Sequence, residues 1–236
     1  MISLYIIVPA YNEEENIYGF VESWYPVIEK IGGESKLVVI DDGSKDKTYE
    51  VLCALSKDRP YLCPLTKSNS GHGPTLLYGY KYAIENHADY IFQTDSDGQT
   101  DGSEFQDFWN MINEYDAIIG NRLNRGDGKL RKYIENMVCF LLKIIFGVSV
   151  KDANAPFRLM KTELINKYID RLPKDFNLPN IMFTTYFVYY NENITFRPIT
   201  FKARQGGLNS MNIRKIAKIG IKAIGDFRKL KKQMRK

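Results

Sequence analysis

The chain has 236 residues, of which 44% are apolar and 26% charged, so its composition is that of a globular protein and excludes disordered and fibrous classes. Its net charge of +5 is uneven, because residues 212–236 hold ten Lys or Arg and one acid. No apolar run approaches the ~20 residues of a membrane-spanning helix, and the length suffices for one large α/β domain or two small ones. Three widely spaced cysteines, Cys53, Cys63 and Cys139, favour a reducing compartment, which predicts a cytoplasmic location.

Short apolar runs alternate with amphipathic stretches through the first half of the sequence. Strands are predicted at 4–8, 36–40, 61–66, 89–94 and 116–121. Helices are predicted at 13–31, at 46–56 and after Gly73, where Pro74 suits the first helical turn. Single helices between continuously apolar strands indicate a parallel sheet covered on both faces, which is a doubly wound α/β fold. The first apolar run has no basic segment before it, so it is predicted to be a strand and not a signal peptide.

Polar segments rich in acids or glycine follow each of the five predicted strands. In chain order they are "PAYNEEEN", "DDGSKDKT", "NSGHG", "DSDGQTD" and "NRLNRGDG". Because the carboxyl ends of parallel strands lie at one edge of a sheet, these five loops are expected to build a single ligand site.

The loop after the fourth strand carries three acids within seven residues, and these repel one another unless a cation lies among them. Asp95, Asp97 and Gln99 alternate, so on an extended backbone their side chains would point to the same side. Carboxylate and amide oxygens are hard ligands that suit Mg²⁺ or Mn²⁺. The alternative is a turn in which Thr100 or Asp101 caps the next helix.

Two other loops carry candidate nucleotide contacts. Asp41 and Asp42 follow the second strand, where doubly wound domains hold a ribose or a base, although an Asx turn would use the same residues. Gly71 and Gly73 precede a helix whose free N–H groups favour an anion, unless the glycines only make the loop flexible. His72 is either a phosphate donor or a solvated loop residue.

Five segments together carry a family resemblance: "VPAYNEEEN", "VVIDDGSKDKT", "NSGHGPTLLYGYKYAI", "DYIFQTDSDGQTD" and "GNRLNRGD". In order and spacing, over nearly the whole chain, they strongly resemble family-2 glycosyltransferases of the GT-A fold. Within that family the sequence is most similar to the dolichyl- and polyprenyl-phosphate sugar transferases. Those enzymes have D-x-D-x-Q at the metal, G-[ST]-R after the fifth strand and an R-x-x-G-x-S-like segment. The corresponding segments here are "DSDGQ", "GNR" ending in Arg122, and "RQGGLNS" starting at Arg204.

The resemblance implies roles for individual residues. A divalent ion, Mg²⁺ or Mn²⁺, would be held against the donor diphosphate by Asp95, Asp97 and Gln99. The nucleotide-sugar would be contacted by Pro9, Tyr11, Glu13, Asp41, Asp42, Gly71, Asp95 and Ser96. The predicted catalytic residues are Asp97, Arg122, Asp152 and Arg204. A guanidinium fork matches phosphate oxygens, so both arginines would face phosphate; alternatively, Arg122 lies at the surface and Arg204 pairs with an acid.

The implied reaction is a metal-dependent, inverting transfer of a sugar from a UDP- or GDP-sugar to a polyprenyl phosphate at the cytoplasmic membrane face. A hydroxyl acceptor, for example on a surface glycan, would instead need a carboxylate base, for which Asp152 is the candidate. The segment "APFR" at 155–158 departs from the family's G-F-[RK] pattern, so the acceptor is less well defined than the donor. The acidic "PAYNEEEN" argues against a sugar-1-phosphate nucleotidyltransferase, and the complete D-x-D-x-Q motif argues against a silent nucleotide-sugar-binding module.

We expect a single GT-A domain at 1–208, with a nucleotide-sugar-binding half at 1–122 and an acceptor half at 123–208. A basic amphipathic helix is expected at 209–236, and a further helix at 130–147.

The predicted helix at 209–236 carries an apolar stripe surrounded by Lys and Arg: Ile216, Ile219, Ala223, Phe227, Leu230 and Met234. The stripe either lies on an anionic membrane, as in a protein peripheral to the inner membrane face, or docks on the body of the protein. A second apolar stretch, 137–148, is too short to span a membrane and lies either at its surface or in the core. No aromatic residues are interleaved with the basic ones to stack on bases, which argues against nucleic acid as a partner.

Overall fold

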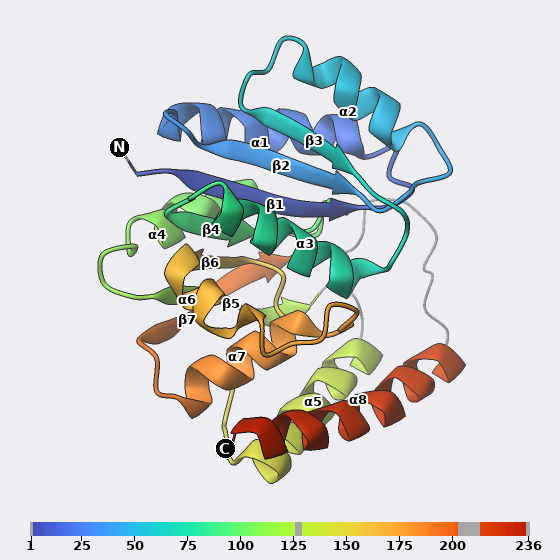
Figure 1. Cartoon of the computed structure of the whole chain (residues 1–236), viewed down its shortest axis with the longest axis vertical. Helices are drawn as coiled ribbons and strands as arrows, with labels where there is room; N and C mark the ends of the chain where they lie inside the picture. Colours follow the sequence, from blue (N-terminus) through green and yellow to red (C-terminus); the bar gives the residue numbers. More distant parts are fainter. Residues whose placement is uncertain (1, 126–128, 203–212, 235–236) are drawn as a thin grey trace.

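The computed structural model describes residues 2–125, 129–202 and 213–234, which form a seven-stranded sheet with helices on both faces (Figure 1). The strand order is β3-β2-β1-β4-β6-β5-β7, and neighbours pair in parallel except at β6, which is antiparallel to both β4 and β5. The strands are β1 Leu4–Ala10, β2 Lys36–Asp41, β3 Leu62–Thr66, β4 Tyr90–Gln93, β5 Ala117–Arg125, β6 Arg158–Lys161 and β7 Ile194–Phe201. The predicted α/β, mainly parallel fold is confirmed.

Burial on both faces explains why the central strands are continuously apolar. Along β1, Tyr5 and Ile7 belong to one hydrophobic cluster, whereas Leu4, Ile6 and Val8 belong to another on the opposite face of the sheet. The edge strand β3 is only partly buried. It also tolerates Pro64, because one side of an edge strand needs no ladder hydrogen bond.

The helices follow the predicted order, although the first two begin later than predicted. They are α1 Ile17–Ile31, α2 Thr48–Ser56, α3 His72–Glu85, α4 Phe105–Trp109, α5 Lys129–Phe146, α6 Thr162–Ile169, α7 Pro179–Tyr189 and α8 Ile213–Met234. The first was predicted from residue 13, but the Glu13 carbonyl instead accepts from the amides of Asn16 and Ile17 in a turn that precedes the helix. Asp101 accepts from the Ser103 amide and so caps the short 3₁₀ turn Gly102–Glu104, as one of the alternatives predicted.

Helix α8 docks on the protein with the described part of its apolar stripe. Ala223, Phe227 and Leu230 are buried, and the Phe227 ring contacts the Phe146 ring of α5 edge-on, with centroids 6.0 Å apart. A membrane location for this part of the stripe is therefore wrong, because its side chains are already covered by protein. The helices α5 and α8 lie side by side at the lower end of the molecule in Figure 1.

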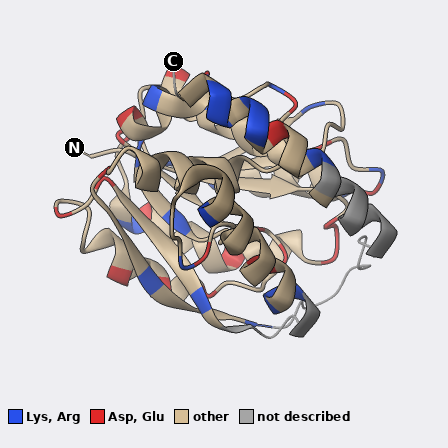
Figure 2. Cartoon of the chain, turned by 90° about the horizontal axis from the view of Figure 1, so that it is seen from below, with Lys and Arg blue, Asp and Glu red and all other residues tan. Residues whose placement is uncertain are grey.

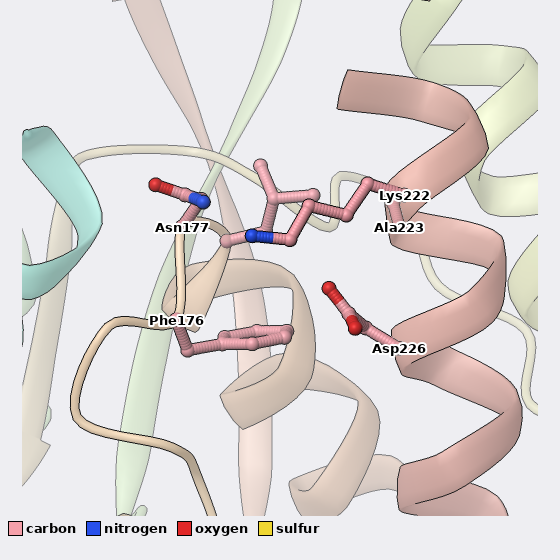
Figure 3. A pocket seen from close by; sticks show the side chains of 6 residues that line it. Phe176, Asn177, Lys222, Ala223 and Asp226 are labelled. Carbon is pink, nitrogen blue, oxygen red and sulfur yellow. The ribbon is translucent and has the colours of Figure 1, made fainter. Parts of the chain in front are cut away.

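A small cavity of ≈ 30 Å³ remains between α8 and the loop that precedes α7 (Figure 3). It is lined by Phe176, Asn177, Leu178, Lys222, Ala223 and Asp226. This volume has room for about one water molecule. In the described ranges, no helix combines the length and the apolar character needed to cross a bilayer.

Candidate active site

Side-chain and backbone hydrogen bonds tie together the loops at the carboxyl edge of the sheet. The Ser96 hydroxyl, after β4, donates to the Pro9 carbonyl at the end of β1 over 3.1 Å. The Asp42 amide donates to the Ala10 carbonyl over 2.8 Å, and the Lys67 amide to the Asp41 carbonyl over 3.1 Å. The loops after β1, β2, β3 and β4 therefore lie together, as the parallel topology predicts.

The acidic loop after β4 is a turn and not an extended segment. The strand ends at Gln93, Gly98 has a φ of 69°, and the Asp97 carboxylate accepts from the Gln99 amide over 3.1 Å. The expectation of an alternating, extended backbone from Asp95 to Gln99 is therefore wrong. Asp95 and Asp97 are half-buried, and the His72 Nε2 atom at the start of α3 lies 3.9 Å from Asp95 Oδ1.

Gln99 is fixed to the end of β7. Its side-chain amide donates to the Lys202 carbonyl over 3.0 Å, and the Lys202 amide donates to the Gln99 carbonyl over 2.8 Å. Gln99 is buried, and because its Nε2 atom donates to Lys202, Oε1 is the atom that could act as a metal ligand.

The donor set of this loop fits a divalent ion that the substrate also helps to hold. Within residues 2–125, 129–202 and 213–234, no group of three or more His, Cys, Asp or Glu side chains is placed to bind an ion alone. Two carboxylates, Asp95 and Asp97, suit Mg²⁺, which is usually bound by one or two carboxylates together with water and substrate phosphates.

Asp41 and Asp42 are buried acids that already accept hydrogen bonds from the protein. Asp41 accepts from the Ser44 amide over 3.1 Å and from the Thr66 hydroxyl over 2.8 Å. Asp42 accepts from the Lys67 ammonium and from the amides of Ser70 and Gly71. Burial raises the pKa of Asp42, but these hydrogen bonds more than offset burial and hold the pKa below its ordinary value.

These contacts change the expected role of the loop before α3. The Gly71 amide donates to the Asp42 carboxylate over 2.8 Å, so this amide already binds an anion of the protein, and an anion site at the first N–H groups of the helix stays a prediction. In the loop after β1, Tyr11 is exposed, whereas Glu13 is buried and its carboxylate accepts from the Asn16 side chain over 2.8 Å.

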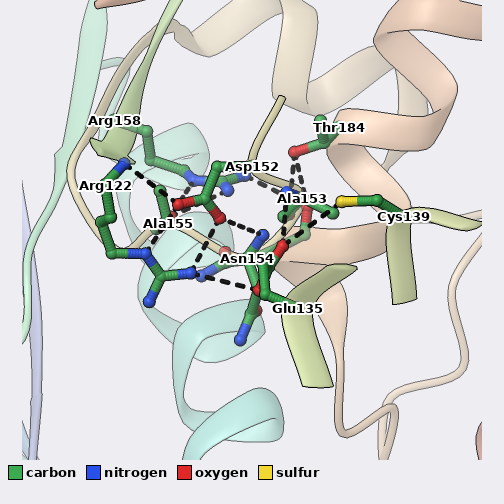
Figure 4. A network of polar contacts seen from close by, with 10 residues as sticks. Arg122, Glu135, Cys139, Asp152, Ala153, Asn154, Ala155, Arg158 and Thr184 are labelled. Atoms are coloured by element: carbon green, nitrogen blue, oxygen red, sulfur yellow. Dashed lines mark hydrogen bonds and ion pairs between the residues drawn. The ribbon is translucent and has the colours of Figure 1, made fainter. Parts of the chain in front are cut away.

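Arg122 of β5 forms an ion cluster with Asp152 and Glu135, and this cluster is largely removed from solvent (Figure 4). The Arg122 guanidinium donates to both carboxylate oxygens of Asp152, over 2.7 and 2.8 Å, and to Glu135 over 3.3 Å. Its fork is thus directed at acids, so the surface alternative is wrong, whereas a contact between Arg122 and a phosphate stays a prediction. The helix α5 supplies Glu135, whose other oxygen accepts from the Ala153 amide over 2.9 Å.

The two acids of the cluster differ in how readily they bind a proton. For Asp152, burial alone would raise the pKa. The hydrogen bonds and charge of Arg122 outweigh burial, so the pKa lies below its ordinary value. For Glu135, burial and the neighbouring Asp152 charge raise the pKa. Asp152 is therefore the persistent anion, and Glu135 is the member that binds a proton more readily.

A second buried arginine supports the segment between Asp152 and β6. Arg158 is fully buried and donates to the carbonyls of Ala155, over 3.1 and 2.9 Å, and of Asn180, over 3.2 Å. It fixes the backbone of the "APFR" segment against α7, beside the ion cluster (Figure 4).

Two residues with clear structural roles were not predicted. Glu135 is the only acid in the sequence of α5, and a single acid in an otherwise apolar and basic helix is a signal of a buried partner. Lys67 precedes "NSGHG" and gave no comparable signal, since one lysine in a polar loop is ordinary. The predicted catalytic Arg204 lies outside the described residues.

The family model described as "Glycosyl transferase family 2" matches residues 5–169. The undecaprenyl-phosphate 4-deoxy-4-formamido-L-arabinose transferases of Pectobacterium atrosepticum and Shewanella sediminis are each 24% identical, over 164 and 168 residues. These matches cover 68% and 70% of this chain but 49% and 50% of the relatives, so the chain spans about half the length of the curated relatives it matches.

Solved structures share the fold at lower sequence identity. Glucosyl-3-phosphoglycerate synthase from Mycobacterium tuberculosis, in complex with Mn²⁺ and UDP-glucose, has a TM-score of 0.66 and 15% identity over 94% of this chain and 76% of its own. TarS 1-349 of S. aureus, in complex with UDP-GlcNAc, has a TM-score of 0.59 and 20% identity over 90% of this chain and 62% of its own.

Proposed function

Because this chain belongs to glycosyl transferase family 2, we propose that it transfers a sugar from a nucleotide-sugar to a lipid phosphate with the help of a divalent ion. The proposal is supported by the hydrogen-bonded loops at the carboxyl edge, by the half-buried pair Asp95 and Asp97, and by the lowered pKa of Asp152. The acceptor would bring the protein to the cytoplasmic face of a membrane as a peripheral protein.

The donor side of the proposal rests on the loops after β1, β2 and β4. Asp95 and Asp97, with the Oε1 atom of Gln99, would hold Mg²⁺ or Mn²⁺. When bound, the ion would neutralise charge that develops on the departing diphosphate. The M. tuberculosis neighbour was solved with Mn²⁺ and UDP-glucose, which is consistent with this kind of site.

The remaining donor residues would position the nucleotide-sugar. His72, beside Asp95, would donate to a diphosphate oxygen. Exposed Tyr11 is available to cover the base, and Asp41 has lone pairs left for a ribose or base donor after its two hydrogen bonds. Pro9, Ser96, Glu13, Asp42 and Gly71 would act by holding the loops around the nucleotide, through the contacts described above.

The single observation that carries the acceptor assignment is the bidentate pair of Asp152 with Arg122. A carboxylate whose pKa is lowered and whose two oxygens face a guanidinium is a poor general base. A hydroxyl acceptor needs such a base, whereas a phosphate monoester is already ionised and attacks the anomeric carbon without one. Attack from the face opposite the diphosphate would invert the anomeric configuration. The curated relatives act on undecaprenyl phosphate by name, in agreement with this acceptor class.

A thermal-shift screen of UDP- and GDP-sugars with Mn²⁺ tests the donor half of the proposal. We expect a concentration-dependent rise in Tm with one nucleotide class, and a smaller rise when EDTA replaces Mn²⁺. The stabilising donor is then incubated with a short, water-soluble polyprenyl phosphate and, in parallel, with an uncharged polyprenol. Transfer to the phosphate alone supports the assignment, whereas transfer to the alcohol would replace it with a hydroxyl acceptor.

A further inference from the structure

Helix α5 exposes a continuous apolar stripe on the outside of the protein. Its members are Tyr133, Met137, Phe140 and Ile144, with 67%, 44%, 62% and 63% of their surface exposed. Their spacing of four, three and four residues places them within about 60° of one another on a helix with 100° per residue. Single exposed apolar residues are normal on proteins, but four in one stripe mark an interaction surface.

The opposite side of the same helix is fixed to the body of the protein. Leu142 and Phe146 are buried, and Glu135 binds Arg122 and the Ala153 amide. On the helical projection these residues lie about 180° from the exposed stripe. The body of the protein therefore already covers the opposite face of α5, and the stripe is the face that points outward.

Exposed charges around the stripe have one sign. In the described parts of α5 and α8, the exposed charged side chains are all basic: Lys132, Lys143, Lys222, Arg228, Lys229 and Lys232. The two acids of these helices, Glu135 and Asp226, are partly buried. Figure 2 shows Lys and Arg along α8, beside an α5 that is mostly uncharged.

An anionic lipid surface fits this combination better than a second copy of the chain. A symmetric dimer through α5 would bring the same surface of two copies together, and would so place like charges opposite each other. An anionic bilayer attracts the cations with its headgroups and accepts the apolar side chains at the boundary of the acyl region.

We propose that the exposed face of α5, formed by Tyr133, Met137, Phe140 and Ile144, inserts into the interface of an anionic membrane, with the cations of α8 alongside. The inference rests on the proposed lipid-phosphate acceptor. The same helix carries Glu135 on its inner side, so the membrane surface and the ion cluster lie on opposite sides of one helix. A lipid phosphate held at that surface would thus be about one helix diameter from the ion cluster.

Vesicle sedimentation with the full chain tests the surface. The wild-type protein is compared with a Phe140→Ser/Ile144→Ser variant and with Tyr18→Ser, a control on α1 with 55% exposure. Vesicles contain phosphatidylcholine alone or an equal mixture with phosphatidylglycerol. We expect wild type and Tyr18→Ser to bind the mixed vesicles, and the double variant to bind at least about tenfold more weakly, because two apolar side chains no longer enter the interface.

A charge variant separates the contribution of the α8 cations from that of the apolar stripe on α5. Lys229→Glu/Lys232→Glu on α8 should weaken binding to the mixed vesicles, with a loss that shrinks at high salt, and should leave the Phe140 side chain's depth in the bilayer unchanged. A Phe140→Trp variant reports that depth through quenching by brominated lipids.

Three outcomes would overturn the proposed membrane surface. The wild type could fail to bind the mixed vesicles, the double variant could bind as well as the wild type, or Tyr18→Ser could lose as much binding as the double variant. A wild-type dimer that becomes monomeric in the double variant would assign α5 to a protein interface instead. Transfer to the water-soluble polyprenyl phosphate needs no membrane and should be unchanged in the double variant. If all proteins lack that transfer while binding still depends on the stripe, the proposed function fails and the membrane surface stands.

Discussion

Acids occur at both ends of the candidate site, but they are held by different kinds of partners. At the carboxyl edge of the sheet, Asp42 is bound by Lys67 and by two backbone amides, all within 29 residues along the chain. In the ion cluster, Asp152 is bound by Arg122, from a strand 30 residues earlier, and shares that arginine with Glu135 of α5. The separations along the chain are almost the same, but the first arrangement joins two loops that follow the neighbouring strands β2 and β3, whereas the second joins a strand, a helix and a loop.

The difference predicts different consequences of substitution. Asp95 and Asp97 are half-buried acids at the carboxyl edge and the proposed ligands of the ion, so their loss should affect activity more than stability. The ion cluster is removed from water, so its loss should affect stability first, because a buried charge without its partner is costly.

The largest expected effect is the loss of activity in Asp97→Asn. The amide can still accept from the Gln99 amide, so the turn is kept, but one anionic ligand of the ion is lost. Metal-dependent donor hydrolysis should fall by roughly a thousandfold or more. Asp101→Asn is the matched control, since Asp101 contacts Lys202 and Ser103 and should retain most activity. Equal rates in the two variants would remove Asp97 from the metal site.

Breaking the ion cluster should produce the largest loss of stability. Arg122→Met removes the guanidinium that pairs with Asp152 and Glu135, and should lower the free energy of unfolding by about 3–5 kcal/mol, measured by urea denaturation. Asp152→Asn should cost less, because Glu135 remains as a partner for Arg122. If Asp152→Asn destabilises the protein as much as Arg122→Met, then Glu135 does not stabilise Arg122, contrary to the contact in the structure.

The two glycines at the start of α3 should differ in a defined way. A Cβ on Gly73 would lie 2.4 Å from the Phe176 carbonyl oxygen, so Gly73→Ala must displace backbone and should cost about 1–3 kcal/mol or more. A Cβ on Gly71 meets nothing within 4 Å, but its φ of 92° is strained for alanine, so the cost should be nearer ~1 kcal/mol. Thermal and urea unfolding give the loss of stability in each variant. Gly73→Ala measures the cost of steric overlap, and Gly71→Ala measures the cost of backbone strain.

The smallest expected effect is a change in the pH dependence of stability. The pKa of Glu135 is raised, so the folded state keeps a proton that the unfolded state releases, and stability from this group is lost as pH rises through the folded pKa. Glu135→Gln should flatten this decrease. The lowered pKa of Asp152 acts in the opposite sense, so its stabilisation should still be lost on the acid side in both proteins. An unchanged profile in Glu135→Gln would contradict the shifted pKa.

The parallel strands and their loops could be predicted because each signal lies within a few neighbouring residues. Apolar runs mark β1 and β2, and the acids and glycines that follow mark the carboxyl edge. β6 could not be predicted in the same way, because its four residues, Arg158–Lys161, are ordered by pairing with β4 and β5 and not by a pattern of their own.

The site was predictable in residue types but not in contacts. Asp95, Asp97, Arg122 and Asp152 were selected from motifs, yet the bond between Arg122 and Asp152 depends on where the chain returns after α5. Gln99 was expected beside the metal, and its link to Lys202 spans 103 residues. Such links arise from tertiary packing, which local sequence patterns do not report.

The position of β6 also has a consequence for synthesis on the ribosome. Strands β1 to β4 come from the first 93 residues and can pair as soon as they emerge, but the free edge of β4 has no neighbour until residues 158–161 follow. At about 5–20 residues per second the nascent chain would carry this bare edge for roughly 3–13 s. An unpaired edge is a template for aggregation, so substitutions that delay β6 should lower yield in cells even when the finished protein is equally stable.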